Sequence, residues 1–339
     1  MPEPNPANAK APRPHDFAIV LTPQFSLMAF SSLIEPMRNA NLRSGQSLYR
    51  WRLLSVRGGP VHASAGVSVD TMPLGSVAQP LPDTLLVCGG LETEHYRDRE
   101  LEAFLRRLAR HGVVVGAVST GSWLLAHAGL LDDRPCTVHW AYVDAFREAF
   151  PELDVQEQIF LHDGERVTCA GGTAALDLML AIIREDHGAH LANRVSENFI
   201  HGFPREAHAG QRMDVHVRLG LQHPSLVRAV EIMENALEQP LAKASVAHQC
   251  GVSLRQLERL FKRYLGMSPA RFYMQLRLNK ARKLLRQTTL PVTEVYLACG
   301  FQTGSHFSKC YRDAFACRPS DERVNTPSVS SQALRVALA

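Results

Sequence analysis

The sequence predicts an α/β domain built on a mainly parallel β-sheet, followed by a smaller domain made only of helices. Three observations predict this: strand-like segments alternate with helical ones through residues 16–200, one short motif occurs twice near the end of the chain, and charge is unevenly distributed. With 339 residues, 45% of them hydrophobic, the chain is long enough for two cores. The expected division is a flexible arm over 1–15, the α/β domain over 16–200, a linker over 201–221, the helical domain over 222–323 and a flexible tail over 324–339.

The α/β domain follows from the order of its elements. Short apolar runs that end at Gly, Ser or Thr-Pro predict buried strands, and the segments between them have helical spacing. Parallel strands joined by helices form a sheet covered on both faces, which binds ligands at the carboxyl ends of its strands. The expected strands are 17–21, 49–56, 84–88, 113–118, 160–161 and 166–170. The expected helices are 27–40, which Pro36 interrupts, 92–110, 123–131 and 174–186.

Two strand ends carry residues suited to ligand binding. Gly89-Gly90 lets the backbone approach a ligand closely, and its N–H groups suit an anion or a carbonyl oxygen. The strand-to-helix turn Gly116–Gly121 resembles the elbow that raises a nucleophile above a sheet, with Ser119 in the nucleophile's place. Such a serine needs a base, and His139 is the best candidate. The alternative is that Ser119 caps a helix and His139 packs in a pocket wall.

Charge separates the two domains. Between Gln222 and Asp321 there are 15 Lys and Arg against 7 Asp and Glu, a net charge of +8, whereas the rest of the chain has 22 against 26, or −4. A basic module joined to a mildly acidic one is expected when one part meets nucleic acid. A basic surface that only aids solubility is the alternative.

Composition argues against several kinds of protein and site. No apolar run reaches the about 20 residues of a membrane-spanning helix, and the proline-rich start lacks the apolar stretch of a secretory signal. The seven scattered cysteines include no Cys-x-x-Cys pair, and the histidines show no ligand spacing. We therefore expect a cytoplasmic protein with no membrane association, no metal and no cofactor.

The helical domain contains an internal repeat. Val246–Ser253 is echoed by Val295–Gln302, with Cys-Gly pairs 49 residues apart. In each copy a helix, a glycine turn and an amphipathic second helix follow one another, which is the helix-turn-helix unit. The second helices are expected over Leu254–Leu265, with Ser253 as N-cap, and over about Gly304–Phe315, with a basic helix over Pro269–Arg286 between the copies.

The second helix of such a unit enters the major groove of DNA, and two copies on a rigid helix fit successive grooves about 34 Å apart. Arg suits guanine and Gln suits adenine, while flanking Lys and Arg suit phosphates. A plain helical bundle with solvated charges is the alternative. The expected DNA-binding residues are Ser253, Arg255, Gln256, Arg259, Lys262, Arg263, Thr303, Ser305, His306, Lys309 and Arg312.

The α/β domain resembles the PfpI-type, class I glutamine-amidotransferase-like fold, which is flavodoxin-like. The resemblance lies in Ser119–Leu131, Thr137–Trp140 and Thr168–Asp177 and covers about Asp16 to Asn198. Family enzymes carry Cys at the elbow, often followed by His, and a carboxylate after the first strand. This chain has Ser119 and Thr120 at the elbow and no Asp or Glu after the strand until Glu35. The departures imply a ligand pocket with no catalytic residue; a hydrolase that uses Ser119 is the alternative.

The helical domain resembles the AraC-type DNA-binding domain over about Gln222–Arg323, through Val246–Pro269 and Gly300–Pro319. It departs at Ala316–Pro319, where the family usually has Gly-x-Ser-Pro. Together the two domains resemble the GlxA-like regulators of the AraC family, which include regulators of carnitine, glycine betaine and arginine catabolism. The resemblance implies a transcription regulator of a catabolic operon, not an enzyme. It would act as an activator, as a homodimer, on double-stranded promoter DNA with RNA polymerase.

The resemblance also implies a small-molecule effector, either a quaternary ammonium metabolite or an amino acid such as arginine. Trp140 or Trp123 suits a quaternary ammonium through a cation–π contact, although such tryptophans are more often part of a core. A dimerisation module that binds no ligand is a further alternative. The expected ligand-binding residues are Gly89, Gly90, Ser119, Thr120, His139, Trp140, Gly172 and Thr173.

Overall fold

The computed structural model describes residues 13–77 and 80–322, which form two compact units. One unit holds the chain up to Val143 together with Phe150–Gln211, and the other holds Asp144–Ala149 and the chain from Arg212 onward. The expected linker over 201–221 is thus divided after Gln211. Residues 1–12 of the expected arm and the whole expected tail lie outside the described residues.

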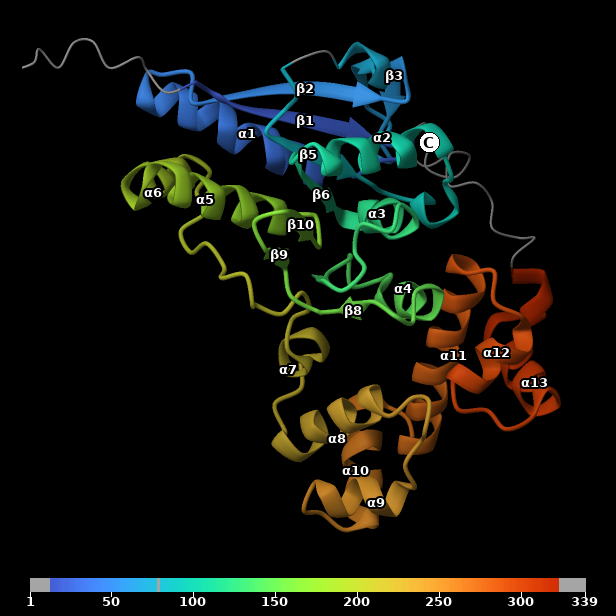
Figure 1. Ribbon diagram of the computed structural model, residues 1–339. Coiled ribbons are helices and arrows are strands. Elements are labelled where there is room, and N and C mark those ends of the chain that lie inside the picture. Colours follow the sequence, from blue (N-terminus) through green and yellow to red (C-terminus); the bar gives the residue numbers. More distant parts are fainter. Residues whose placement is uncertain (1–12, 78–79, 323–339) are drawn as a thin grey trace, which may run out of the picture. The chain divides into compact units, whose positions relative to one another are not determined.

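The first unit is the predicted α/β domain (Figure 1). In the described residues its main sheet has eight strands in the order β3-β4-β2-β1-β5-β6-β10-β9. The neighbours β4-β2-β1-β5-β6-β10 pair in parallel, and the edge strands β3 and β9 pair antiparallel, which confirms a mainly parallel sheet. The strands are β1 (His15–Leu21), β2 (Tyr49–Ser55), β3 (Arg57–His62), β4 (Ser68–Pro73), β5 (Thr84–Cys88), β6 (Val114–Val118), β9 (Phe160–His162) and β10 (Arg166–Cys169), with β7 (Pro135–Cys136) and β8 (Asp154–Val155) as a separate pair.

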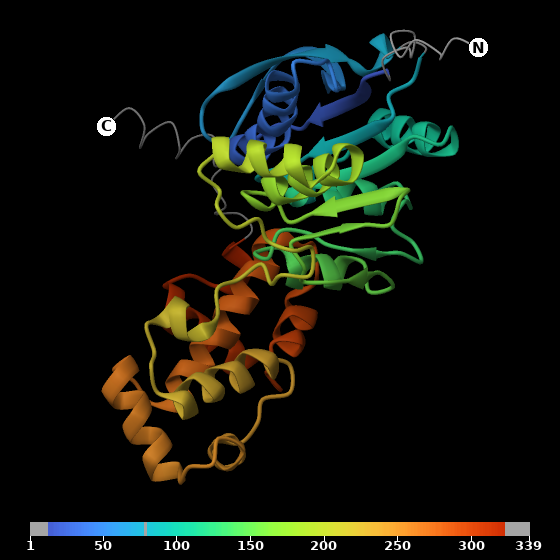
Figure 2. The same ribbon diagram turned by 90° about the vertical axis from the view of Figure 1, so that its left-hand side faces the viewer.

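Helices cover both faces of the sheet. Helices α1 (Leu27–Ser44), α5 (Ala174–His187) and α6 (Ala189–Asn198) pack on one another, and Figure 2 shows the blue and yellow-green helices on one side of the strands. Helices α2 (Arg99–Arg110) and α3 (Ser122–His127) pack against β6. The apolar faces of α1 and α5 meet the strand side chains in one fully buried core, so the carboxyl strand ends are held rigidly.

Three local predictions in this unit are wrong. Pro36 does not interrupt α1, which continues to Ser44 because the flanking residues Leu33 and Met37 are fully buried in the core. The helix expected over 92–110 begins only at Arg99, where the Asp98 carboxylate caps it by accepting two backbone N–H groups. The helix expected over 123–131 ends at His127.

The second unit is helical throughout its described part, as predicted. Val215, Leu226, Met233, Leu257 and Phe261 belong to its buried core. Its elements are α4 (Val143–Ala149, of which 144–149 belong here), α7 (Val215–Leu219), α8 (Pro224–Asn235), α9 (Lys243–Gln249), α10 (Leu254–Leu265), α11 (Pro269–Gln287), α12 (Val292–Ala298), α13 (Gly304–Phe315) and the 3₁₀ turn η5 (Pro319–Glu322).

The internal repeat becomes two helix-turn-helix units, α9–α10 and α12–α13, joined by α11. Helices α10 and α13 have the predicted bounds, and Ser253 forms a capping box with Gln256 at the start of α10. The turn glycines Gly251 and Gly300 have φ of +67° and +72°, a left-handed conformation that favours glycine. A Cβ on Gly251 would meet nothing within 4 Å, whereas on Gly300 it would lie 2.6 Å from the Pro240 side chain.

The second helices of the two helix-turn-helix units, α10 and α13, end differently. Helix α10 ends on Gly266 with φ of +71°, and α13 ends on Ala316 with φ of +57°. A non-glycine residue in this conformation costs about 1 kcal/mol. We expect Ala316→Gly to stabilise the second unit by that amount and Gly266→Ala to destabilise it similarly, measured by urea denaturation followed by circular dichroism. If Ala316→Gly destabilises the second unit, the left-handed conformation of Ala316 is not a source of strain.

Glu322 holds the end of the second repeat. Its side chain is 2% exposed and accepts hydrogen bonds from Arg282 Nε at 2.9 Å, Arg286 Nε at 2.7 Å and the Tyr311 hydroxyl at 2.8 Å. Burial alone would raise the pKa of Glu322, but hydrogen bonds from Cys317, Tyr311 and the two arginines outweigh it and lower the pKa to about 2. The charged carboxylate therefore ties η5 to α11 and α13.

Because the folded pKa of Glu322 lies below that of an unfolded glutamate, its contribution to stability is complete above about pH 4.5 and is lost as the pH falls toward about 2. We expect Glu322→Gln to destabilise the second unit by about 3 kcal/mol at pH 7, since it uncouples two arginines from a buried partner. The difference between the two proteins should shrink below pH 4.5 in urea denaturation. A difference that is constant from pH 7 to pH 3 would contradict this role.

Candidate functional site

Ser119 stands at a tightly packed strand-to-helix turn. It follows β6, has φ of +64°, is 6% exposed, and begins the 3₁₀ turn η4 (Ser119–Gly121) that leads into α3. A Cβ on Gly171 would lie 2.7 Å from Ser119 Cβ, and one on Gly89 would lie 2.4 Å from Gly121 N. The glycines after β5 and β10 therefore let two neighbouring backbones close on the elbow.

The predicted ligand-binding residues gather at the carboxyl ends of β5, β6 and β10. The Thr120 hydroxyl donates to Gly90 O at 2.6 Å, and the His139 backbone N–H donates to Ser119 O at 3.3 Å. Thr120 is buried and its hydroxyl serves this internal bond, whereas Trp140 is 40% exposed. Gly172 and Thr173 follow Gly171, which packs on Ser119. The eight residues thus form one local cluster from four separate segments.

Four groups are candidates to activate Ser119 or to replace it as a nucleophile: His139, Glu35, Cys88 and Cys169. His139 Nδ1 accepts the Ala141 N–H at 3.3 Å, so this ring nitrogen already has a backbone partner. Glu35 pairs with Arg38 on the exposed part of α1. Burial raises the pKa of Cys88 and of Cys169 to about 12, so neither thiol is ionised at neutral pH.

The two candidate tryptophans differ in exposure. Trp123 is 2% exposed and packs edge-to-face on Phe150, with ring centroids 5.5 Å apart. It belongs to the core, so the suggested cation–π contact with Trp123 is wrong. Trp140 lies beside His139, with ring centroids 5.6 Å apart, and is 40% exposed.

Asp177, which the sequence reading did not single out as functional, anchors the segment after α6. Its fully buried carboxylate accepts His201 Nε2 at 2.8 Å and the backbone N–H and guanidinium of Arg205 at 2.7–2.9 Å. Arg205 also donates to the Thr173 hydroxyl at 2.9 Å. The expected ligand-binding residue Thr173 is therefore bonded to the segment that follows α6 in the first unit.

Gln211 makes a second attachment at the end of the first unit. Its side-chain amide nitrogen donates to Thr137 Oγ1 at 2.8 Å, Val138 O at 3.0 Å and Gln158 O at 2.9 Å. Thr137 and Val138 directly precede His139. Gln211, the last residue of the first unit, is thus bonded to the two residues that precede His139.

The second unit presents its basic side chains on α10 and α13. Leu257 and Phe261 of α10 and Phe307 and Tyr311 of α13 are buried, so each helix has one face in the core. The opposite side carries exposed polar and basic residues. Exposed among the expected DNA-binding residues are Ser253, Arg255, Gln256, Arg259, Lys262, Arg263, Thr303, Ser305, His306, Lys309 and Arg312.

Some of these residues also stabilise the helices themselves. Ser253 and Gln256 form the capping box of α10, and Thr303 caps α13 by accepting the His306 N–H at 3.4 Å. Lys262 donates to Gly266 O at 3.3 Å. Arg255 and Arg259 are in no ion pair with another described residue, which leaves them for an external partner.

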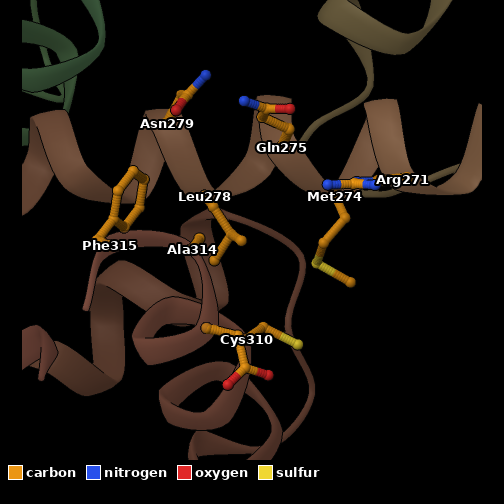
Figure 3. A pocket seen from close by; sticks show the side chains of 9 residues that line it. Arg271, Met274, Gln275, Leu278, Asn279, Cys310, Ala314 and Phe315 are labelled. Atoms are coloured by element: carbon orange, nitrogen blue, oxygen red, sulfur yellow. The ribbon is translucent and has the colours of Figure 1, made fainter. Parts of the chain in front are cut away.

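A cavity of about 410 Å³ lies between α11 and α13 (Figure 3). Leu278 and Met274 of α11 and Cys310 and Ala314 of α13 form its apolar lining, and Arg271 lies at one end. No expected ligand-binding or DNA-binding residue lines it. This cavity is therefore separate from the elbow cluster.

Within residues 13–77 and 80–322, no helix is long and apolar enough to cross a membrane. The same residues include no group of three or more His, Cys, Asp or Glu side chains placed to hold a metal ion.

Comparison with known proteins identifies both units. The model of the DJ-1/PfpI family matches residues 16–185, and a helix-turn-helix domain model matches residues 246–324. The crystal structure of an AraC family transcriptional regulator from Pseudomonas putida is 30% identical with a TM-score of 0.51, and covers 55% of this chain and 100% of its own. The HTH-type transcriptional regulator CdhR of Pseudomonas aeruginosa is 46% identical, over 92% of each chain. The chain belongs to the AraC family of transcriptional regulators.

Membership of the AraC family, with a DJ-1/PfpI domain before the helix-turn-helix region, confirms both resemblances. The HTH-type transcriptional regulator GlxA of Rhizobium meliloti is 40% identical and covers 90% of this chain and 94% of its own. These relatives are transcriptional regulators and not enzymes, so this AraC-family protein is a DNA-binding transcriptional regulator.

Proposed function

We propose that this AraC-family regulator activates a catabolic operon in the cytoplasm when a small metabolite binds beside Ser119. The observation that carries the proposal is the attachment of Gln211 beside His139, because it joins the elbow cluster to the point where the chain enters the DNA-binding unit. A ligand that binds one conformation of residues 137–139 more tightly than another shifts the equilibrium between these conformations, by an amount set by the difference in affinity. The sensor unit thus works without turnover and without a cofactor.

On the DNA side, the proposed contacts are the exposed residues of α10 and α13 together with their N-caps. Arg255 and Arg259 would reach base edges from α10, while Lys262, Arg263, Lys309 and Arg312 would contact phosphates. The protein would bind paired sites on double-stranded promoter DNA as a homodimer and there contact RNA polymerase.

On the ligand side, the proposed pocket consists of Gly89, Gly90, Ser119, Thr120, His139, Trp140, Gly172 and Thr173. The effector would be a quaternary ammonium metabolite or an amino acid. The exposed face of Trp140 supports the first class through a cation–π contact.

The test combines a ligand screen with DNA footprinting on the promoter beside the gene. Carnitine, glycine betaine, dimethylglycine and arginine are tested for a rise in melting temperature, and any hit is then added to the footprint. We expect one of the compounds to change the protection of the promoter DNA. We also expect wild type and Ser119→Ala to show no difference in the consumption or formation of any metabolite. Footprints that ignore every compound would favour a ligand-independent dimerisation module, and turnover that Ser119→Ala removes would favour an enzyme.

A further inference from the structure

Glu94 is a buried carboxylate next to the elbow. It lies on the 3₁₀ turn η3 (Thr93–His95), which packs against η4 and α3. Thr93 fixes this turn to the strand end, because its hydroxyl oxygen accepts the Gly90 N–H at 2.9 Å. Glu94 is 7% exposed. The carboxylate is therefore held in the same cluster as the proposed ligand residues.

One oxygen of the Glu94 carboxylate lacks a hydrogen-bond donor among the described residues. This oxygen, Oε2, is buried and accepts no hydrogen bond. Arg97 does not supply one, since it donates to the backbone carbonyls of Glu94 and Tyr96 at 3.1 and 2.9 Å. Burial raises the pKa of Glu94 and the charge of Glu92 adds to this, whereas a hydrogen bond from the Glu94 backbone N–H and the charge of His95 oppose it. A buried acceptor without a donor costs folding free energy, which a protein tolerates where a ligand supplies the donor.

Aromatic side chains gather in the segment bonded to Ser119, against whose turn the Glu94 turn packs. Burial, followed by the charges of Glu94 and Glu92, raises the pKa of Tyr142. Tyr142 closes a turn that begins at His139, because its N–H donates to His139 O at 2.8 Å. The His139 ring lies 6.2 Å from that of Tyr142 and 5.6 Å from that of Trp140. A carboxylate with aromatic rings nearby is an environment that selects organic cations.

We infer that Glu94 binds the positively charged nitrogen group of the effector, with Tyr142 and Trp140 beside it. The inference rests on the proposed function, since it places the ligand in the elbow cluster. It adds that a positive charge on the ligand is required. An ammonium with N–H groups would also donate to the free Oε2, whereas a quaternary one would be held by charge and by the rings.

The test is isothermal titration calorimetry on the full chain with four compounds that each carry a positively charged nitrogen group: glycine betaine, dimethylglycine, carnitine and arginine. Glycine betaine is paired with 3,3-dimethylbutanoate, in which carbon replaces the charged nitrogen. We expect at least one of these compounds to bind the wild type, its dissociation constant to rise at least tenfold in Glu94→Gln, and no heat with 3,3-dimethylbutanoate, which keeps the carboxylate and lacks the positive charge. The matched control is Glu100→Gln, an exposed glutamate on α2, which should bind like the wild type.

Thermal melting separates a ligand-binding Glu94 from a structural one. We expect Glu94→Gln without ligand to melt at or above the wild-type temperature, since it removes a buried charge that has no donor at Oε2. A variant that melts several degrees lower would assign Glu94 a structural role and overturn the inference. Equal binding of these compounds by wild type and Glu94→Gln would overturn it while the proposed effector pocket stands. If none of them binds the wild type, the inference and the proposed ligand classes fail together.

Discussion

Replacing Arg255 and Arg259 together with alanine is expected to abolish protection of the promoter beside the gene. Both side chains are exposed on α10, one helical turn apart, and neither is in an ion pair with another described residue. Loss of a base contact costs about 1–3 kcal/mol, so the pair should lose about 2–6 kcal/mol, or roughly 30-fold or more in affinity. Footprinting and fluorescence anisotropy at fixed salt concentration measure the loss.

The control must remove the same charge elsewhere, because DNA affinity depends on charge and salt. Arg99 and Arg110 are exposed on α2 of the sensor unit, so Arg99→Ala with Arg110→Ala changes the net charge equally. We expect that variant to keep the wild-type footprint. Full protection of the promoter by the Arg255→Ala, Arg259→Ala variant would show that α10 does not make the predicted base contacts.

Gly300→Ala is expected to have the largest effect on stability, about 3 kcal/mol or more. The new Cβ would combine a left-handed backbone with distances of 2.6–2.7 Å to Pro240 Cδ and to the carbonyl oxygens of Leu237 and Glu238. The backbone conformation alone costs about 1–2 kcal/mol, and overpacking adds about 1–3.

The internal repeat supplies the matched variant. Gly251→Ala introduces the same conformational strain but no close contact, so it should cost only about 1 kcal/mol. Hydrogen exchange of peptides from α12 and α13 reports the second unit directly, whereas all three tryptophans lie in the first unit and their fluorescence does not. Equal losses of stability in Gly300→Ala and Gly251→Ala would show that the residues around position 300 shift to accommodate the added Cβ.

Local signals made the DNA-binding helices predictable. The bounds of α10 and α13 agree with the prediction to the residue, because caps, glycine turns and amphipathic spacing all lie within each short segment. The edge strand β3 and its neighbour β4 were not expected, since they are mostly exposed and Arg57–His62 contains two glycines and a proline.

The residues around the elbow were harder to predict because their roles depend on distant partners. Gln211 bonds to Thr137, 74 residues away, and Arg205 bonds to Asp177, 28 residues away. Glu94 lies in a strongly charged stretch, and nothing in its neighbours along the chain indicates that it is buried. Only the fold brings such groups together.

The three hydrogen bonds of Gln211 also determine how the two units are tethered. Residues 212–214 alone separate Gln211 from α7, whose Val215 is already part of the second core. Under the proposed function, a ligand-induced displacement of Thr137 and Val138 would reach α7 through these three residues. We expect that inserting a few glycines there leaves both units folded and weakens the response of promoter binding to the metabolite.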